Sequence, residues 1–181
     1  MFIGSVLFVA VNCKSSMMRN AEKRLEPDRN FSVITFFRPA VFFGDGVKFS
    51  LWDGENFIGI MTAGNYIQYM AKPGKHLFMA LGGKGSALKA DIAPGKNYYV
   101  AGRVIPGAFK GHLRLFPANI DEIDKINTWF EEMTQIEMVP EKGNIYSKRM
   151  ESRVKTAIKK FNEPGADYAV MGASEGIPSK K

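Results

Sequence analysis

The chain has 181 residues, 45% of them hydrophobic and 24% charged, with a formal net charge of +7 and a pI near 9.5. This composition is typical of one globular domain with extensions, long enough to bury a sizeable core without cross-links. A single cysteine excludes an internal disulfide and a zinc site built on cysteine pairs. The basic balance favours contact with lipid headgroups, cell-wall polymers or nucleic acid, although a well-solvated surface is its commoner meaning.

The N-terminal segment is an apolar run, "FIGSVLFVAVN" at residues 2–12, that ends directly before the only cysteine, Cys13. Its length fits the apolar part of a secretory signal, roughly 7–15 residues, and is too short to span a bilayer. A lone cysteine in this position resembles the lipobox of bacterial lipoproteins, although Asn12 replaces the usual small residue and no Lys or Arg precedes it. We predict a signal peptide over 1–12 and a lipid on Cys13; the alternative is a buried strand that ends in a buried free cysteine.

The next segment, "KSSMMRNAEKRLEPDRN" at residues 14–30, is polar and contains Pro27. It has no apolar periodicity, so it reads as neither an amphipathic helix nor a half-buried strand. The sequence therefore predicts that residues 13–30 are a lipidated cysteine followed by a tether.

The region from Phe31 to Pro117 is rich in β-branched and aromatic residues, interrupted by glycine and proline. Several segments alternate apolar and polar residues with the period of two that marks a half-buried strand. No helical pattern separates them, which favours an antiparallel β-sandwich or barrel over a parallel α/β sheet. The predicted strands are 31–38, 46–52, 56–61, 65–70, 75–81, 87–92, 97–103 and 111–116.

Three turns punctuate these strands: Asp53-Gly54, Pro73-Gly74 and Pro94-Gly95. The first predicts a type I′ hairpin turn, and the two Pro-Gly pairs predict type II turns, so all three glycines should have positive φ. The apolar strand positions predict the core. Its expected members are Val47, Phe49, Leu51, Leu77, Met79, Leu88 and Ile92.

After Pro117 the apolar period becomes helical, which predicts a helical extension over residues 118–163. The first helix should carry an apolar face from Ile120 to Ile136, with Asn119 as its cap. Gly143-Asn144 should break the pattern, and a second helix should cover residues 147–162. The tail at 164–181 is rich in Gly, Ser and Ala and is predicted to be disordered.

The second predicted helix is strongly basic. Its candidate contacts to an anionic surface are Lys148, Arg149, Arg153, Lys155, Lys159 and Lys160. Its apolar stripe needs a surface to cover, and two are available. Either the helix docks on the β-domain and the basic side is a solvated face, or it lies on anionic lipid.

No sequence motif points to catalysis. The glycine-rich segment "LGGKGSA" at 81–87 lacks the phosphate-loop spacing, because Lys84 is followed by Gly85 in place of Ser or Thr, and a hairpin loop is expected instead. His76 and His112 are the only histidines, and neither lies in a metal-binding motif; a hydrogen-bonding structural role is expected for His76. The sequence therefore predicts no enzyme activity, no metal and no cofactor.

Four segments of the β region resemble a known family. The residues "ITFFRP" at 34–39, "VKFSLWDGENFIGIM" at 47–61, "GNYIQYMAKPGKHLFMA" at 64–80 and "IAPGKNYYVAGRV" at 92–104 are similar to small bacterial envelope lipoproteins whose shared β-domain is of the PEGA kind. The resemblance covers roughly residues 33–117. It implies an immunoglobulin- or transthyretin-like sandwich and a protein that is lipid-anchored in the envelope, facing the periplasm or the exterior.

These observations together favour a non-enzymatic, membrane-anchored lipoprotein that acts as a binding or structural module. The alternative is a binder of anionic ligands through the basic helix, and an enzyme of unrecognised class ranks last. A membrane reached through the lipid anchor is the expected partner, with an anionic surface as a second one. Nucleic acid is disfavoured, and the sequence identifies no protein partner.

Overall fold

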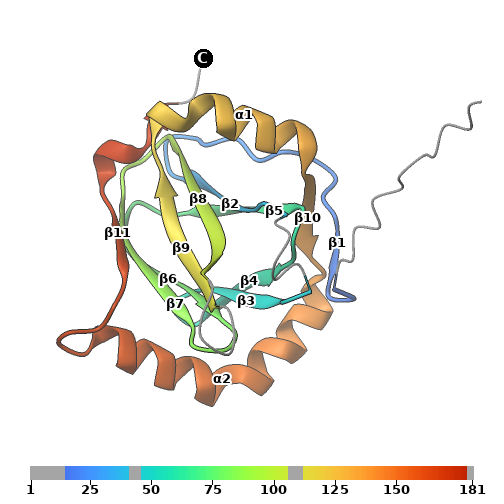
Figure 1. Ribbon diagram of the computed structural model, residues 1–181, viewed down its shortest axis with the longest axis vertical. Coiled ribbons are helices and arrows are strands. Elements are labelled where there is room, and N and C mark those ends of the chain that lie inside the picture. Colours follow the sequence, from blue (N-terminus) through green and yellow to red (C-terminus); the bar gives the residue numbers. More distant parts are fainter. Residues whose placement is uncertain (1–14, 41–45, 106–111, 179–181) are drawn as a thin grey trace, which may run out of the picture.

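The computed structural model of the chain describes residues 15–40, 46–105 and 112–178. Two mixed β-sheets pack face to face, and one helix covers the outer face of each (Figure 1). The prediction of a mainly β fold with two helices towards the C-terminus is confirmed. The predicted signal peptide at 1–12 and the lipid on Cys13 lie outside the described residues.

The first sheet has the strand order β1-β10-β5-β2-β8-β12, and β9 also pairs with β8. Its strands are β1 (Met18–Asn20), β2 (Ser32–Arg38), β5 (Asn65–Ala71), β8 (Lys96–Ile105), β9 (His112–Ala118), β10 (Thr134–Met138) and β12 (Ile177–Pro178). The second sheet has the order β11-β7-β6-β3-β4. Its strands are β3 (Phe49–Asp53), β4 (Asn56–Met61), β6 (Gly74–Leu81), β7 (Ser86–Ile92) and β11 (Ala169–Met171).

The eight predicted strands correspond to β2 through β9, but their pairing is not purely antiparallel. The pairs β2–β8, β10–β5 and β11–β7 are parallel, which departs from the antiparallel sheets of an immunoglobulin-like sandwich. The departure arises because the chain crosses between the sheets after β2, β4, β5, β7, β10 and β11. Turn signals report where a strand ends, and they do not report which sheet the next strand joins.

The three predicted glycines all have positive φ: 53° at Gly54, 125° at Gly74 and 71° at Gly95. The β3–β4 hairpin pairs Asp53 with Asn56, so Gly54 and Glu55 form its two-residue loop. A positive φ at Gly54 alone matches a type II′ turn in place of the predicted type I′. The two Pro-Gly turns connect strands of different sheets.

The main core lies between the two sheets and contains the predicted Phe49, Leu51, Leu88 and Ile92. Met79 is fully buried, but on the outer face of the second sheet, where Leu77 is half-buried beside it. Val47 was expected in the core and is 40% exposed, because β3 begins two residues later at Phe49.

Residues 15–30 do not form the predicted tether. β1 lies at the edge of the first sheet, paired antiparallel with β10, and Met18 is only 4% exposed. The Met18 sulfur accepts a hydrogen bond from the Ile60 N–H. The segment then passes along α1, where Arg24 stacks on the Phe130 ring (Figure 1). One buried methionine in a three-residue strand leaves no periodicity for a sequence pattern to report.

The C-terminal segment is likewise part of the fold. Met171 of β11 is 1% exposed, and β12 pairs antiparallel with the start of β8. The prediction of a disordered tail at 164–181 is therefore wrong for residues 169–171 and 177–178. Strands of three and two residues are too short to show alternation.

The helical extension at 118–163 contains a strand. α1 (Ile123–Glu132) follows a 3₁₀ turn at Ile120–Glu122, and β10 then runs into the first sheet. Ile136, expected on a helix face, is a buried strand residue, and the Asn119 side chain makes no capping hydrogen bond. α1 packs Ile126 and Trp129 against Phe37 on the outer face of the first sheet.

Candidate functional site

The basic helix α2 (Pro140–Asn162) begins seven residues before its predicted start. Pro140 occupies the first turn, where its missing N–H costs nothing. Gly143, predicted to break the helix, lies inside it and is buried. A Cβ at this position would overlap the Met138 side chain. The glycine therefore allows the helix to approach β10 closely.

The apolar stripe of α2 faces the second sheet. Val154 and Phe161 are 1% and 5% exposed and pack with Trp52, Met79 and Leu81. Fully burying an apolar side chain of this size contributes roughly 1.5–3 kcal/mol. The apolar stripe was expected to cover either the β-domain or anionic lipid. In the structure it packs on the second sheet.

The six predicted basic residues are all exposed, on two flanks of the helix. Their spacing places Lys148, Lys155 and Lys159 on one flank. Arg149, Arg153 and Lys160 lie on the other, which borders the loop between β6 and β7. Lys155 donates a 2.6 Å hydrogen bond to Glu151, which lowers the pKa of that carboxyl. The other five form no ion pair with any described residue.

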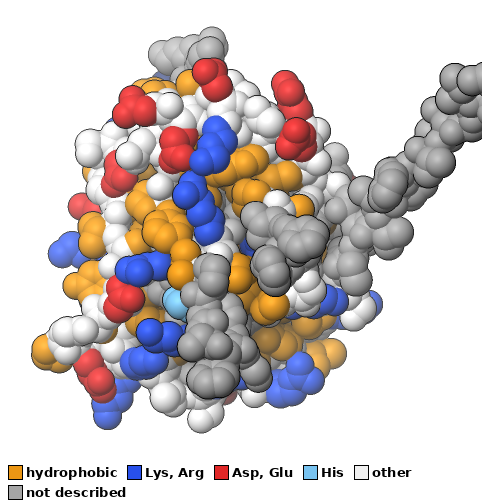
Figure 2. All heavy atoms as spheres, viewed as in Figure 1, with side chains coloured by type: hydrophobic (Ala, Val, Ile, Leu, Met, Phe, Trp, Pro, Cys, Tyr) orange, Lys and Arg blue, Asp and Glu red, His pale blue; other side chains and the backbone are white. Residues whose placement is uncertain are grey.

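Charge is divided between the two helical ends of the molecule. Residues 120–132 hold five acidic residues and one basic residue, whereas α2 holds seven basic and two acidic ones. The two helices lie on opposite sides of the pair of sheets (Figure 1). Figure 2 shows acidic side chains gathered on the α1 side of one face and basic side chains across its middle and its α2 side. The described domain therefore has a negative end and a positive end.

The first described residues lie against the start of α2. The Lys142 ammonium donates a 2.9 Å hydrogen bond to the Ser16 carbonyl, and the Val139 N–H donates one of 2.9 Å to the Met17 carbonyl. Cys13 is three residues before Ser16, so an extended chain holds their Cα atoms within about 11 Å of each other. The described chain thus begins beside the first turn of α2.

The next turn of α2 exposes a large apolar residue. Ile145 is 71% exposed and, by its spacing, lies on the side of α2 opposite the buried Val154. Lys142, Lys148 and Arg149 follow or precede it by three or four positions and surround it on the helix surface. The sequence did not predict Ile145 and Lys142 as site residues, because the helix was expected to begin only after the Gly143-Asn144 pair. Lys142 directly precedes that pair and Ile145 directly follows it. The seven-residue spacing between Lys142 and Arg149 would have revealed that they share a flank.

His76 forms a structural link, in accord with the role expected for it. Its Nδ1 is 2.8 Å from Asp53 Oδ2, and its Nε2 is 2.7 Å from the Lys72 carbonyl oxygen. Both partners only accept, so both ring nitrogens donate and the imidazolium form is favoured. The hydrogen bond with Asp53 is the main cause that raises the pKa of His76.

The remaining contacts of Asp53 complete this link. Tyr69 donates a 3.0 Å hydrogen bond to the same carboxylate oxygen, and burial, with the nearby carboxylate, raises the pKa of the Tyr69 hydroxyl. With both nitrogens occupied, His76 has no lone pair free to accept a proton from a substrate.

The other histidine, His112, is half-buried on β9 beside a small cleft that Lys84, Asp167 and Arg114 also line. Within the described ranges, no group of three or more His, Cys, Asp or Glu side chains could hold a metal ion. None of the helices in the described part of the chain is long and apolar enough to cross a membrane.

The structure thus brings together a set of residues on and around α2 rather than a catalytic cluster. The basic face of α2 collects the six predicted cations with Lys142 and Ile145, and the chain leading back to Cys13 joins it at its first turn. No protein-family model matches the chain, and neither a curated protein nor a solved structure matches it.

Proposed function

We propose that the protein is a non-enzymatic lipoprotein of a bacterial cell envelope, held by a lipid on Cys13 with the basic face of α2 turned towards an anionic membrane surface. The observation that carries the proposal is the junction of Ser16 and Met17 with the first turn of α2. Because this link is short, a lipid on Cys13 brings α2 to the membrane rather than leaving the domain on a long tether.

In this arrangement the basic residues of α2 lie close to the membrane surface. A single acyl chain binds a membrane only marginally, so stable anchoring needs a second signal such as further acylation or a basic patch. Each Lys or Arg close to an anionic leaflet contributes about 1 kcal/mol, within a Debye length of the surface. The exposed Ile145 adds an apolar contact at the headgroup boundary, near the lipid.

The opposite end of the molecule is suited to face away from the membrane. The α1 end carries an acidic excess, which an anionic leaflet repels. The resemblance of residues 33–117 to PEGA-like envelope lipoproteins also supports an envelope location facing the periplasm or the exterior. In this arrangement the α1 side is the one left for a partner, and the protein serves as a binding or structural module.

Two measurements test the proposal. The lipidated full chain should partition into detergent, and Cys13→Ser should move it to the aqueous phase. The Cys13→Ser protein should bind phosphatidylglycerol vesicles at low salt through α2 alone. The double variant R149E/K159E should abolish that binding. K23E/R29E, an equal charge change in the exposed segment that runs along α1, should retain it.

The outcomes separate the two parts of the proposal. Equal partitioning of the wild type and Cys13→Ser would exclude the lipid anchor. Equal loss of vesicle binding in both double variants would show that binding depends on net charge alone and would exclude α2 as the membrane-binding element.

A further inference from the structure

We propose that the groove between the glycine-rich loop Gly82–Gly85 and the C-terminal half of α2 binds a phosphate or phosphomonoester group, with Lys84, Arg153 and Lys160 as its charged ligands. This site is separate from the lipid anchor and would bind its ligand in the unlipidated protein. The groove shares Arg153 and Lys160 with the basic face of α2, whereas Lys84 and the loop Gly82–Gly85 lie outside that face.

The groove combines two elements that are far apart in the sequence. It has a volume of about 160 Å³, with the loop after β6 forming one wall and Arg153, Thr156 and Lys160 of α2 forming the other. Three cations and no carboxylate line it. Since a water molecule occupies about 30 Å³ of liquid, the space suits a small anion with a few waters.

The backbone of the loop is shaped to offer N–H groups. Gly83 and Gly85 have positive φ, 60° and 73°, whereas Gly82 and Lys84 do not. Turns that alternate in this way can direct successive N–H groups towards one anion. The Gly85 N–H closes the turn on the Gly82 carbonyl at 3.3 Å, and the N–H groups of Gly83 and Lys84 bond to no other described backbone group.

The glycines have different roles. A Cβ at Gly82 would overlap the Phe49 ring, so this position is set by packing. A Cβ at Gly83 would meet nothing within 4 Å, so this part of the loop is open to a ligand. The segment lacks the spacing of a nucleotide-binding phosphate loop. In the structure, Arg153 and Lys160 of α2 add two cations beside Lys84.

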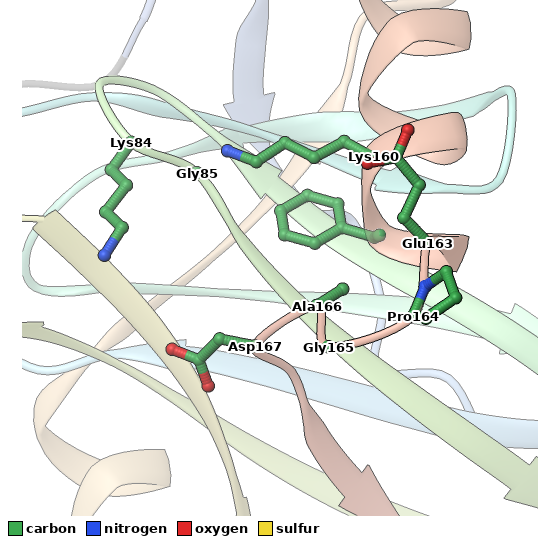
Figure 3. Close-up of a pocket in the computed structure, with 9 residues that line it drawn as sticks. Lys84, Gly85, Lys160, Glu163, Pro164, Gly165, Ala166 and Asp167 are labelled. Carbon is green, nitrogen blue, oxygen red and sulfur yellow. The ribbon is translucent and has the colours of Figure 1, made fainter.

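A neighbouring cleft of about 310 Å³ shares Lys84 and Lys160 with the groove (Figure 3). Lys160 points towards the loop that carries Gly85 (Figure 3). Its ammonium lies 5.8 Å from the centroid of the Phe161 ring. The cleft also contains Glu163 and Asp167, but Asp167 forms a 2.6 Å ion pair with Arg114. Lys84 and Lys160 form no ion pair with any described residue, which leaves both available to an anion.

One effect opposes binding. The C-terminal end of a helix carries partial negative charge, and this groove lies near the end of α2. Lys159 and Lys160 in the last turn offset that charge. Because the cations are exposed, the affinity should be modest and should fall as salt is raised. Three cations favour a dianion over a monoanion of the same size.

The test is a titration of the full-length Cys13→Ser protein with inorganic phosphate, followed by the amide signals of Gly83, Lys84 and Gly85 in NMR at constant ionic strength. We expect saturable shifts at these three amides, and a Kd about tenfold weaker or more in K84A/K160A. The matched control K148A/K159A removes two cations from outside the groove and should leave the Kd within about twofold. Thermal unfolding checks that all three proteins fold alike.

Three results would overturn the proposal: no saturable shift, an equal response to chloride, or an equal weakening in K148A/K159A. A second experiment distinguishes a lipid phosphate from a soluble one. Stronger binding of the protein to vesicles containing phosphatidic acid than to phosphatidylglycerol vesicles of equal charge density, lost in K84A/K160A, would identify a lipid headgroup. Phosphate binding without that preference would identify a soluble phosphomonoester. Neither result depends on R149E/K159E, so this site and the membrane contact can fail separately.

Discussion

The Lys142 ammonium donates a 2.9 Å hydrogen bond to the carbonyl of Ser16, a residue 126 positions earlier in the chain. This contact joins the first turn of α2 to the segment that leads back to Cys13. The Val139 N–H bonds the Met17 carbonyl beside it, and β1 continues the junction along β10. The N-terminal segment is thereby fixed to the positive end of the molecule.

The stripe that holds α2 to the second sheet gives a stability prediction. Phe161→Ala removes a side chain that is 5% exposed and should lower the free energy of unfolding by about 3–5 kcal/mol. Ile145→Ala removes a large side chain from the same helix where it is 71% exposed, and should change stability by no more than about 0.5 kcal/mol. Urea unfolding of both variants measures the difference. Similar losses in the two would show that α2 does not dock through Phe161.

The link between His76 and Asp53 predicts a pH dependence. The pKa of His76 is raised in the folded protein, chiefly by its hydrogen bond with Asp53. The folded state therefore holds the proton more tightly than the unfolded state. The stabilisation is complete below the unfolded pKa of about 6.5 and is lost as pH rises through the folded pKa.

Unfolding by urea between pH 5 and 9 checks this effect. The wild type should lose stability across the interval, and His76→Gln should lose that part of the pH dependence. His112→Gln, a change at the other histidine, should behave like the wild type. A His76→Gln profile parallel to that of the wild type would contradict the assignment.

The turn glycines give a third prediction. Gly74 and Gly95 have φ of 125° and 71°, where a β-branched residue is strained. Gly74→Val and Gly95→Val should each destabilise the protein by about 1–2 kcal/mol or more. Gly46, where a Cβ meets nothing within 4 Å and φ is not positive, provides the control Gly46→Val. Equal unfolding temperatures for the three variants would rule out a conformational requirement at the two turns.

Local chemistry in the sequence predicts much of this fold. Asp53-Gly54 and the Pro-Gly pairs mark the ends of strands, and the alternation of Phe49 and Leu51 marks a buried face. Both signals act within a few residues. The parallel pairing of β2 with β8 depends on residues more than 60 positions apart, such as Phe36 and Val100, and no short pattern encodes it.

The candidate site was predicted only in part, for the same reason. The charges of α2 are visible in the sequence because they recur at helical spacing. Met18 and Met171 are buried through contacts with distant elements, and their short strands therefore resembled a tether and a tail. Gly143 lies inside a helix because Met138 leaves no room for a side chain there, a contact that the local sequence does not reveal. The groove beside Gly83 likewise needs the loop and α2 to meet.

The orientation of the molecule on the membrane is the most direct test of the account. The lipidated protein would carry one added cysteine, at Ile145 on α2 or at Asn127 on the exposed side of α1, labelled with a nitroxide while Cys13 is occupied by lipid. Electron paramagnetic resonance on vesicles containing phosphatidylglycerol reports how deep each label lies, from its relative access to oxygen and to a polar relaxing agent. If α2 faces the membrane, the label at position 145 lies among the headgroups and the label at 127 lies in water. A label at 127 that is as deep as the one at 145, or both labels in water, would contradict this orientation.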